Sequence, residues 1–262
     1  EPFRFVDIGG GRAAFLADDI GGQTTSGCST VPVNYQLYIT DGTTAGTQRV
    51  TSLGYPTPGL GCVGSASVHY HNGDVYFIAD EGTGLNQQLY KYNVASGTTT
   101  RLTSFNTPSS AFDPGIHFIG RFTNFCSSGE HVYFRMDSLP TSQRGALICK
   151  SDGTVAGTEI AVDNTKLNAD IGGGNHGIDA DIMRAFKNKL FFEIETDDGT
   201  VWRQSSQLVY YDPCLDEVVN ITNYPHNFGG VWATSLNYTN QVWADSVLFF
   251  GSRPGGISAD YL

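Results

Sequence analysis

The stretch His71-Asn-Gly-Asp-Val-Tyr-Phe-Ile-Ala-Asp80 joins a tight turn to a strand. Asn-Gly at 72–73 accepts the positive φ angles of a type I′ hairpin. The aromatic and β-branched run that follows is typical of a strand. Ser128-Gly-Glu130 and Lys187-Asn-Lys189 occupy comparable places before two further runs. The sequence therefore predicts β-hairpins that recur along the chain.

The recurrence has a period. The equivalent phenylalanines of successive runs are spaced by 57 to 62 residues and are Phe15, Phe77, Phe134, Phe192 and Phe250. A second series of strands begins at Gln36, Gln88, Ala146 and Gln207, and a third at Arg49, Arg101, Ile160 and Asn220. With the strand before each phenylalanine, a unit holds four antiparallel strands, which is the size and content of a β-propeller blade.

We therefore predict an all-β fold, a single β-propeller domain over residues 1–262 with no helix of any length. Four blades are complete and only the first half of a fifth is expected. The predicted blades cover residues 1–54, 64–106, 115–163, 177–223 and, incomplete, 230–262. Because half a blade leaves an open strand edge, the chain is expected to be a fragment of a longer protein.

Two turns share the motif DGTxAGT, namely Asp41-Gly-Thr-Thr-Ala-Gly-Thr47 and Asp152-Gly-Thr-Val-Ala-Gly-Thr158. An Asp side chain accepts backbone N–H bonds within a turn, and the Gly after it supplies a positive φ. The sequence therefore predicts that Asp41, Gly42, Asp152 and Gly153 build turns between the third and fourth strands and carry no chemistry.

These motifs resemble those of bacterial secreted β-propellers with ELWxxDGTxxGT repeats. Gln36-Leu-Tyr-Ile-Thr-Asp-Gly-Thr43 is close to that pattern, with Gln for Glu and Tyr for Trp. The resemblance implies a propeller fold and export, and it brings no catalytic residues. An extracellular, cell-surface or periplasmic location is expected.

The net charge of the chain bears on which partners it can bind. The net charge of −11, from 15 basic and 26 acidic residues, argues against binding to nucleic-acid phosphates. No apolar run approaches the roughly 20 residues that span a membrane. We expect no nucleic acid and no membrane span, and a protein or glycan partner, with the chain acting as a subunit of a larger assembly.

The five cysteines are Cys28, Cys62, Cys126, Cys149 and Cys214. None forms a CxxC pair, so a zinc ribbon has no support. Either they are buried free thiols, or the protein is exported and carries one or two disulfides. Cys28–Cys62 is the favoured pair because both lie in connections at the same end of the blades, and Cys126–Cys149 is a possible second pair within blade 3.

Connections of two kinds follow from the four-stranded unit. Those between strands A and B and between C and D are short. Those between B and C and between D and the next A are long and lie at the other end: 19–35, 54–64, 105–115, 163–177, 195–206 and 223–230. Long connections on a rigid scaffold usually carry binding, so these are the predicted binding segments.

The sequence signal for metal ligands is less specific than the signal for the repeat. Asp18, Asp80, Asp137 and Glu195 end the phenylalanine-bearing strands, and Asp197 and Asp198 extend the last of these. They either cap their own connections or, with loop carbonyls, hold calcium. His117, His176 and His226 precede the first strands of successive blades and would be transition-metal or acid–base residues if they converged. No cofactor is predicted, and calcium is the metal these carboxylates would allow. His69 and His71 are expected to be solvated or packed.

The predicted function is a non-enzymatic exported β-propeller that binds a protein or glycan through its long B–C and D–A connections. Two alternatives stay open, because propellers host many functions. One is a propeller-type polysaccharide lyase or glycosidase. The other is a propeller appended to a catalytic domain.

Overall fold

The computed structural model describes residues 3–18, 35–52, 68–80, 87–104, 125–137, 146–172, 175–197, 204–222, 241–243 and 247–249. By their contacts, residues group into two compact units. One unit is Glu1–Ser142 with Cys149–Glu159, and the other is Gln143–Ile148 with Ile160–Leu262.

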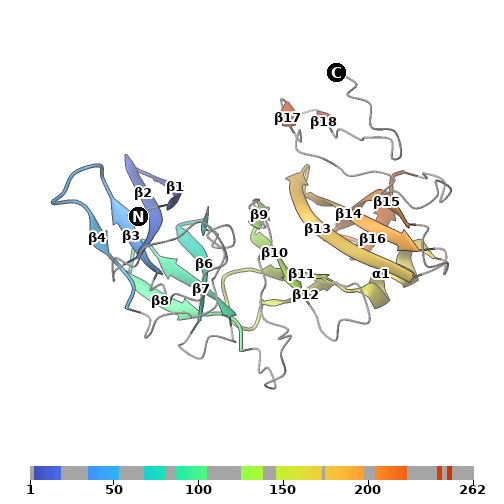
Figure 1. Cartoon of the computed structure of the whole chain (residues 1–262), viewed down its shortest axis with the longest axis horizontal. Helices are drawn as coiled ribbons and strands as arrows, with labels where there is room; N and C mark the ends of the chain where they lie inside the picture. The colour runs from blue at the N-terminus through green and yellow to red at the C-terminus, as the bar shows by residue number, and fades with distance from the viewer. Residues whose placement is uncertain are drawn as a thin grey trace. The chain divides into compact units, whose positions relative to one another are not determined.

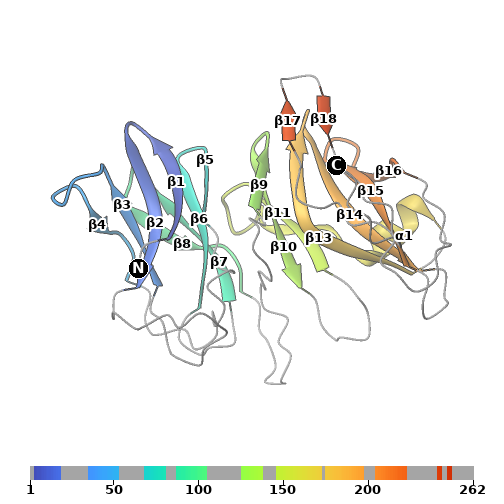
Figure 2. The same cartoon turned by 45° about the horizontal axis from the view of Figure 1, so that its top comes forward.

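The strands form four-stranded antiparallel sheets, whose strands are labelled in Figures 1 and 2 and which we call blades 1 to 4. Blade 1 contains β1 (Phe3–Gly9), β2 (Arg12–Asp18), β3 (Tyr35–Thr40) and β4 (Gln48–Arg49). Blade 2 contains β5 (Val68–His71), β6 (Asp74–Asp80), β7 (Gln87–Asn93) and β8 (Thr98–Arg101). Blade 3 contains β9 (Phe125–Ser128), β10 (His131–Asp137), β11 (Ala146–Ser151) and β12 (Glu159–Val162). Blade 4 contains β13 (Asn175–Phe186), β14 (Lys189–Asp197), β15 (Gln204–Asp212) and β16 (Glu217–Asn220).

Each blade pairs its strands in chain order, and a final two-stranded sheet joins β17 (Gln241–Trp243) to β18 (Val247–Phe249). The predicted fold class is therefore confirmed: the protein is all-β, with four complete β-propeller blades followed by the first two strands of a fifth. The single-domain assignment and the blade boundaries stay predictions.

The phenylalanine series is confirmed in blades 1 to 4. Phe15, Phe77, Phe134 and Phe192 all lie in the second strand of their blades. The register is equivalent as well, because Phe15 pairs with Tyr38, Phe77 with Tyr90 and Phe192 with Val209. Phe250 lies outside the described residues.

The second strand of a blade has an apolar run in its middle because both faces of the strand are covered there. In β6, Val75, Tyr76, Phe77 and Ile78 are all buried. Val75 and Phe77 belong to a core that also contains Ala14, Leu16 and Leu37 of blade 1. This core packs blades 1 and 2 side by side, as Figures 1 and 2 show. A continuous apolar run, rather than an alternating one, is the expected sequence of a strand buried on both faces.

One hydrogen-bonded pair of side chains, Gln with Thr, recurs in three blades, buried in blades 1 and 2 and partly buried in blade 4. The Thr51 hydroxyl donates to Gln36 Oε1 (2.8 Å) and accepts from the Leu37 N–H (2.9 Å). The same bonds link Thr103 with Gln88 and Leu89 in blade 2, and Thr222 with Gln207 and Leu208 in blade 4. We call each of these a Gln–Thr lock. It ties the start of strand C to the residues after strand D.

Blade 3 lacks the lock. When the two DGTxAGT motifs are aligned, Leu147 and Val162 stand where blade 1 has Gln36 and Thr51. Val162 is fully buried, and neither Leu147 nor Val162 has a side-chain group that could form the lock's hydrogen bonds. The alignment also moves the strand C series of blade 3 by one residue, so that Leu147 rather than Ala146 corresponds to Gln36.

The expectation that the chain has no helix is wrong. The helix α1 (Asn164–Ile171) follows β12, inside a predicted long connection. Asp163 caps its start by accepting a bond from the Lys166 N–H (2.7 Å), and Gly172 with φ +73° ends it. Leu167 is fully buried. A helix of two turns leaves too short a periodic pattern to stand out from a loop in the sequence.

The first turns of the blades behave as predicted at 72–73, where Asn72 and Gly73 both have positive φ. The turn of blade 4 adopts the same left-handed geometry without glycine, with φ +48° at Lys187 and +59° at Asn188. Only glycine and, to a lesser extent, asparagine and aspartate occupy this region without strain.

We therefore expect the double change Lys187→Asn, Asn188→Gly to stabilise blade 4 by about 1 kcal/mol. The measurement is urea unfolding of the full chain followed by circular dichroism. The opposite exchange, Asn72→Lys with Gly73→Asn, puts the turn residues of blade 4 into blade 2. It should lower the free energy of unfolding by a similar amount. Equal stability of all three proteins would contradict the turn assignment.

Candidate functional site

The two ends of each blade differ in the connections they carry. Strands A and B of blades 1 to 4 are joined by residues 10–11, 72–73, 129–130 and 187–188. Strands C and D are joined by residues 41–47, 94–97, 152–158 and 213–216. The opposite ends carry the B–C and D–A connections, which run through residues 19–34, 50–67, 81–86, 102–124, 138–145, 163–174, 198–203 and 221–240.

The predicted binding segments therefore lie largely outside the described residues. Three of their predicted boundaries are wrong in blade 4. Strand β13 begins at Asn175, strand β14 continues to Asp197 and strand β15 begins at Gln204. His176, Glu195 and Ser206 therefore lie within strands rather than beside them. The connection 163–177 also contains α1.

In the C–D turns of blades 1 and 3, side chains of the turn form hydrogen bonds with other groups of the same turn. Asp41 Oδ1 accepts bonds from the N–H (2.9 Å) and hydroxyl (2.7 Å) of Thr43, whose hydroxyl accepts from the Gly46 N–H (2.9 Å). Thr47 donates to the Thr43 carbonyl (2.6 Å) and bonds the Thr40 hydroxyl (2.7 Å). One carboxylate oxygen of Asp41 is thereby bonded within the turn.

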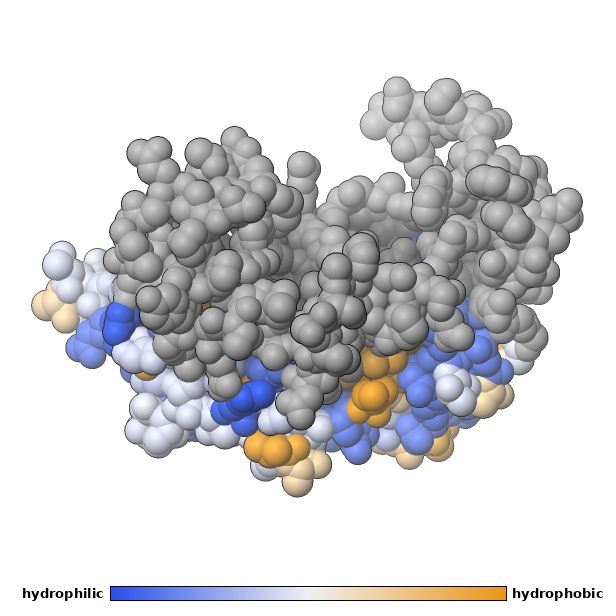
Figure 3. All heavy atoms as spheres, turned by 60° about the horizontal axis from the view of Figure 1, so that its bottom comes forward, coloured by the Kyte–Doolittle hydropathy of each residue, from blue (hydrophilic) through white to orange (hydrophobic). Residues whose placement is uncertain are grey.

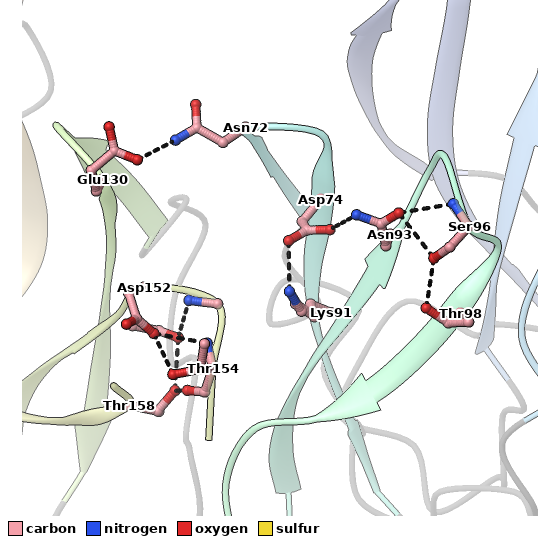
Figure 4. Close-up of polar contacts among 12 residues, drawn as sticks. Asn72, Asp74, Lys91, Asn93, Ser96, Thr98, Glu130, Asp152, Thr154 and Thr158 are labelled. Atoms are coloured by element: carbon pink, nitrogen blue, oxygen red, sulfur yellow. Dashed lines mark hydrogen bonds and ion pairs between the residues drawn. The ribbon is translucent and has the colours of Figure 1, made fainter. Parts of the chain in front are cut away.

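The turn of blade 3 repeats this network. Asp152 Oδ1 accepts from the N–H (2.8 Å) and hydroxyl (2.7 Å) of Thr154, and Thr158 bonds the Thr154 carbonyl (2.6 Å), as Figure 4 shows. Bonds from the threonine hydroxyl and amide hold the pKa of Asp152 below its ordinary value, as they do for Asp41. A Cβ at Gly157 would lie 2.2 Å from the Asp152 carboxylate, so the second glycine of the motif is required for this geometry.

The turn of blade 3 also contacts blade 2. An ideal Cβ at Gly153 would lie 2.8 Å from Tyr76 Oη and 3.2 Å from Lys91 Nζ. At the equivalent Gly42, no such atom lies within 4 Å. The DGTxAGT turn therefore occurs in two environments. Its first glycine faces open space in blade 1 and contacts the neighbouring blade 2 in blade 3.

The surface of blade 2 under this turn is polar and titratable. Asp74 is buried; it accepts from Lys91 Nζ (2.8 Å) and from Asn93 Nδ2 (2.6 Å), as drawn in Figure 4. Burial, together with the charges of Asp74 and Asp152, raises the pKa of Tyr76 to about 12. Further along this surface, His69 stacks on Phe125 of β9 with ring centroids 5.9 Å apart. Asn72 Nδ2 donates to Glu130 Oε2 across the two blades at 3.4 Å.

We call this contact the blade 2–3 seam: His69, Tyr76 and Lys91 from blade 2, with Phe125 and Gly153 from blade 3. His69 and His71 are packed rather than solvated, since the Nε2 atoms of both are buried. The sequence interpretation missed the seam. Its signal was present in the alternation of His69 and His71, which places both on the sheet face that carries Tyr76, Asp74 and Lys91.

The predicted metal ligands are placed as follows. Asp18, Asp80 and Asp137 are the last residues of β2, β6 and β10, as predicted from the repeat. Glu195 and Asp197 lie in β14, opposite Gly177 and Asn175 of β13. Asp198, His117 and His226 lie outside the described residues. Among the side chains that the structure describes, no three of His, Cys, Asp or Glu form a group that could hold a metal ion.

His176 has a structural partner. Its Nε2 lies 2.8 Å from the carbonyl oxygen of Gly172, and its main-chain N–H donates to Asn168 Oδ1 (3.3 Å). Because a carbonyl only accepts, Nε2 carries the proton. The ring therefore ties the end of α1 to β13, and its proposed metal or acid–base role stays a prediction.

The possible second disulfide, between Cys126 and Cys149, is absent. Both residues are buried thiols, and burial raises the pKa of Cys149 to about 12. Cys126 in β9 lies opposite Tyr133 of β10, and β11 with Cys149 lies on the far side of β10. Two strand spacings of about 4.8 Å exceed the roughly 7 Å limit between the Cα atoms of a disulfide. Cys214 is an exposed thiol, and Cys28 and Cys62 lie outside the described residues.

Few large apolar side chains are exposed among the described residues. The large apolar side chains that are exposed are Phe5, Val155, Ile160, Leu215 and Ile221. Figure 3 shows the described residues on one side as mostly hydrophilic, with hydrophobic ones in small separate spots. No described helix is long and apolar enough to cross a membrane.

No protein-family model matches the sequence, and no curated protein is significantly similar to it. Several solved structures resemble the fold. TolB from Acinetobacter baumannii is 12% identical with a TM-score of 0.42, over 95% of this chain and 52% of TolB. Puromycin hydrolase is 13% identical with a TM-score of 0.48, over 95% and 32% of the two chains. The β-propeller domain of the Trilobed protease from Pyrococcus furiosus is 13% identical with a TM-score of 0.44, over 84% and 54%.

The chain thus spans about half the length of TolB and of the Trilobed protease propeller domain, and about a third of puromycin hydrolase. With TM-scores below 0.5, these likenesses carry no argument about substrates or partners.

Proposed function

We propose that this protein is an exported, non-enzymatic β-propeller that binds a protein or glycan partner through its B–C and D–A connections. The observation that carries the proposal is the difference between the two ends of each blade. At one end every connection holds 2 to 7 residues, and the C–D turns of blades 1 and 3 repeat the same bonds. At the other end the connections range from 6 residues, as in the B–C connections of blades 2 and 4, to 23 residues, and they differ from blade to blade in sequence.

Chemistry supports the same division. One oxygen of the Asp41 carboxylate and one of the Asp152 carboxylate accept bonds within their own turns, so these side chains hold the turn geometry. Variable connections can change from blade to blade without disturbing the sheets that hold them. Such segments are the usual carriers of recognition in rigid repeat folds.

The proposed location is extracellular, cell-surface or periplasmic. A Cys28–Cys62 disulfide would support it, because disulfides persist in oxidising compartments. Non-reducing peptide mapping of the native protein tests this pair, and finding both as free thiols would remove that support.

The binding proposal is tested by first screening the purified chain on a polysaccharide array and on a panel of purified exported proteins. Replacing Gln23-Thr-Thr-Ser26 by Gly-Ser-Gly-Ser, or Phe112 or Tyr224 by Ala, should then weaken binding to the ligand found by at least tenfold. The melting temperature should change little, by less than about 4 °C. Segment 163–174 is a poor target, because Leu167 is buried there.

Val155→Ser is the matched control. Val155 is 61% exposed in the C–D turn of blade 3, so this change should leave both binding and melting temperature unchanged. Equal loss of affinity in the control would place recognition at the turn end and contradict the proposal. Release of new reducing ends from a bound polysaccharide would favour the lyase or glycosidase alternative instead.

A further inference from the structure

We propose that the blade 2–3 seam opens at acidic pH, because protonation of His69 separates β5 from Phe125 of blade 3. The inference does not depend on which ligand the connections bind. It concerns a contact wholly within one compact unit, residues 1–142 with 149–159.

The first step is the position of His69 between two blades. Its ring stacks on Phe125, which is itself only 4% exposed. In β5 it pairs with Tyr76 of β6, and Tyr76 pairs in turn with Lys91 of β7. Directly opposite residues of antiparallel strands lie on the same sheet face, so all three side chains belong to the face that meets blade 3.

The second step is the state of the imidazole nitrogens. The Nε2 atoms of His69 and His71 are buried, and neither has a hydrogen-bond partner in the described part of the chain. A neutral imidazole tolerates this, since one nitrogen can remain an unprotonated acceptor. A protonated ring would place an N–H donor and a charge there without an acceptor, which is costly in a buried site.

The third step is that the acidic side chains of the seam already accept hydrogen bonds from other groups. Asp74, opposite His71, accepts bonds from Lys91 and Asn93. Glu130 of blade 3 bonds Asn72, and Asp152 is held by Thr154. His131 of β10 packs near Tyr133. On the blade 1 side, β1 and β2 pack against β5 and carry Arg4, Asp7 and Arg12.

The direction of the pH effect follows from these contacts. Burial, with a smaller contribution from the charge of His71, lowers the pKa of His69 to about 4. In an open seam the ring would return to its ordinary value of about 6.5. Because the folded value is depressed, the closed seam is fully stable above pH 6.5 and loses stability as pH falls from 6.5 towards 4.

A buried thiol in blade 3 reports the opening. Cys149 is 1% exposed, and in the alignment of the two DGTxAGT motifs it stands where blade 1 has Tyr38, the partner of Phe15. This places it on the sheet face of Phe134 and Phe125, which meets blade 2. Its reaction with 4,4′-dithiodipyridine, mapped by mass spectrometry, therefore measures how often the seam opens. Relative to the urea-unfolded chain at the same pH, we expect the labelling rate of Cys149 to rise roughly twentyfold from pH 7 to pH 5. A rate independent of pH would overturn the proposal.

Variants separate His69 from the other groups. His69→Phe keeps a ring against Phe125 and removes the titration, so its labelling rate should stay flat between pH 7 and pH 5. His131→Gln, on the blade 3 side, should keep the rise of the wild-type protein. The same rise in His69→Phe would assign the opening to another group and overturn the role of His69.

A measurement on the wild-type protein covers the case in which His69→Phe does not fold. The NMR signal of the His69 ring should show no titration near pH 6.5 while the protein is folded. A normal titration near pH 6.5 would mean that the ring is already accessible, and it would overturn the proposal without any variant.

Discussion

Replacing Gly153 by alanine is expected to lower the free energy of unfolding by about 3 kcal/mol. Two costs add. The residue has φ +86°, where an L side chain costs about 1–2 kcal/mol. The new methyl group would also meet Tyr76 Oη at 2.8 Å and Lys91 Nζ at 3.2 Å, and forcing these side chains aside costs about 1–3 kcal/mol more.

Gly42→Ala provides the matched control, because its turn has the same hydrogen bonds. Gly42 has φ +88°, and its Cβ would meet nothing within 4 Å. It should cost only the backbone term, about 1–2 kcal/mol. Urea unfolding of both variants, followed by circular dichroism, gives the difference. If the two variants were equally stable, the seating of the Asp152 turn on blade 2 would be refuted.

Replacing Thr103 by valine, which has nearly the same shape, is expected to cost about 2–3 kcal/mol. Thr103 is only 5% exposed, and its hydroxyl joins Gln88 Oε1 to the Leu89 N–H. The change removes both bonds at once and leaves the Leu89 amide without its acceptor. An unsatisfied buried donor costs about 1–3 kcal/mol beyond the lost bond.

The control is Thr99→Val in β8, where the side chain is exposed. It should change the stability by less than about 0.5 kcal/mol. Hydrogen exchange at the Leu89 amide gives a local readout, and it should accelerate in Thr103→Val alone. Unchanged exchange at this amide would mean that the Gln–Thr lock does not hold strand C.

The sequence predicted the repeated parts of this protein well, for a physical reason. Strands buried on both faces need continuous apolar runs, and left-handed turns need Asn-Gly or Gly. Both requirements leave local marks, which is why the run around Phe77 and the turn at 72–73 were placed correctly.

Features that depend on pairs far apart in the chain were harder to predict. The lock between Gln36 and Thr51 is visible in the sequence only as a recurring interval of 15 residues. The seam contact between Asn72 and Glu130 joins residues 58 apart, and no local pattern marks it. The failed pairing of Cys126 with Cys149 has the same origin, because spacing along the chain did not reveal that β10 lies between them.

The DGTxAGT turns have a consequence for the order of folding. All the bonds of the 41–47 network join residues no more than seven apart, and the turn forms the same bonds whether or not a neighbouring blade covers it. Loops of about ten residues close within 10–100 ns, far faster than distant strands meet. During synthesis each turn can therefore form as soon as its own residues leave the ribosome. The seating of Gly153 against Tyr76 requires blade 2, so in blade 3 the turn can form early but can dock only once blade 2 is in place.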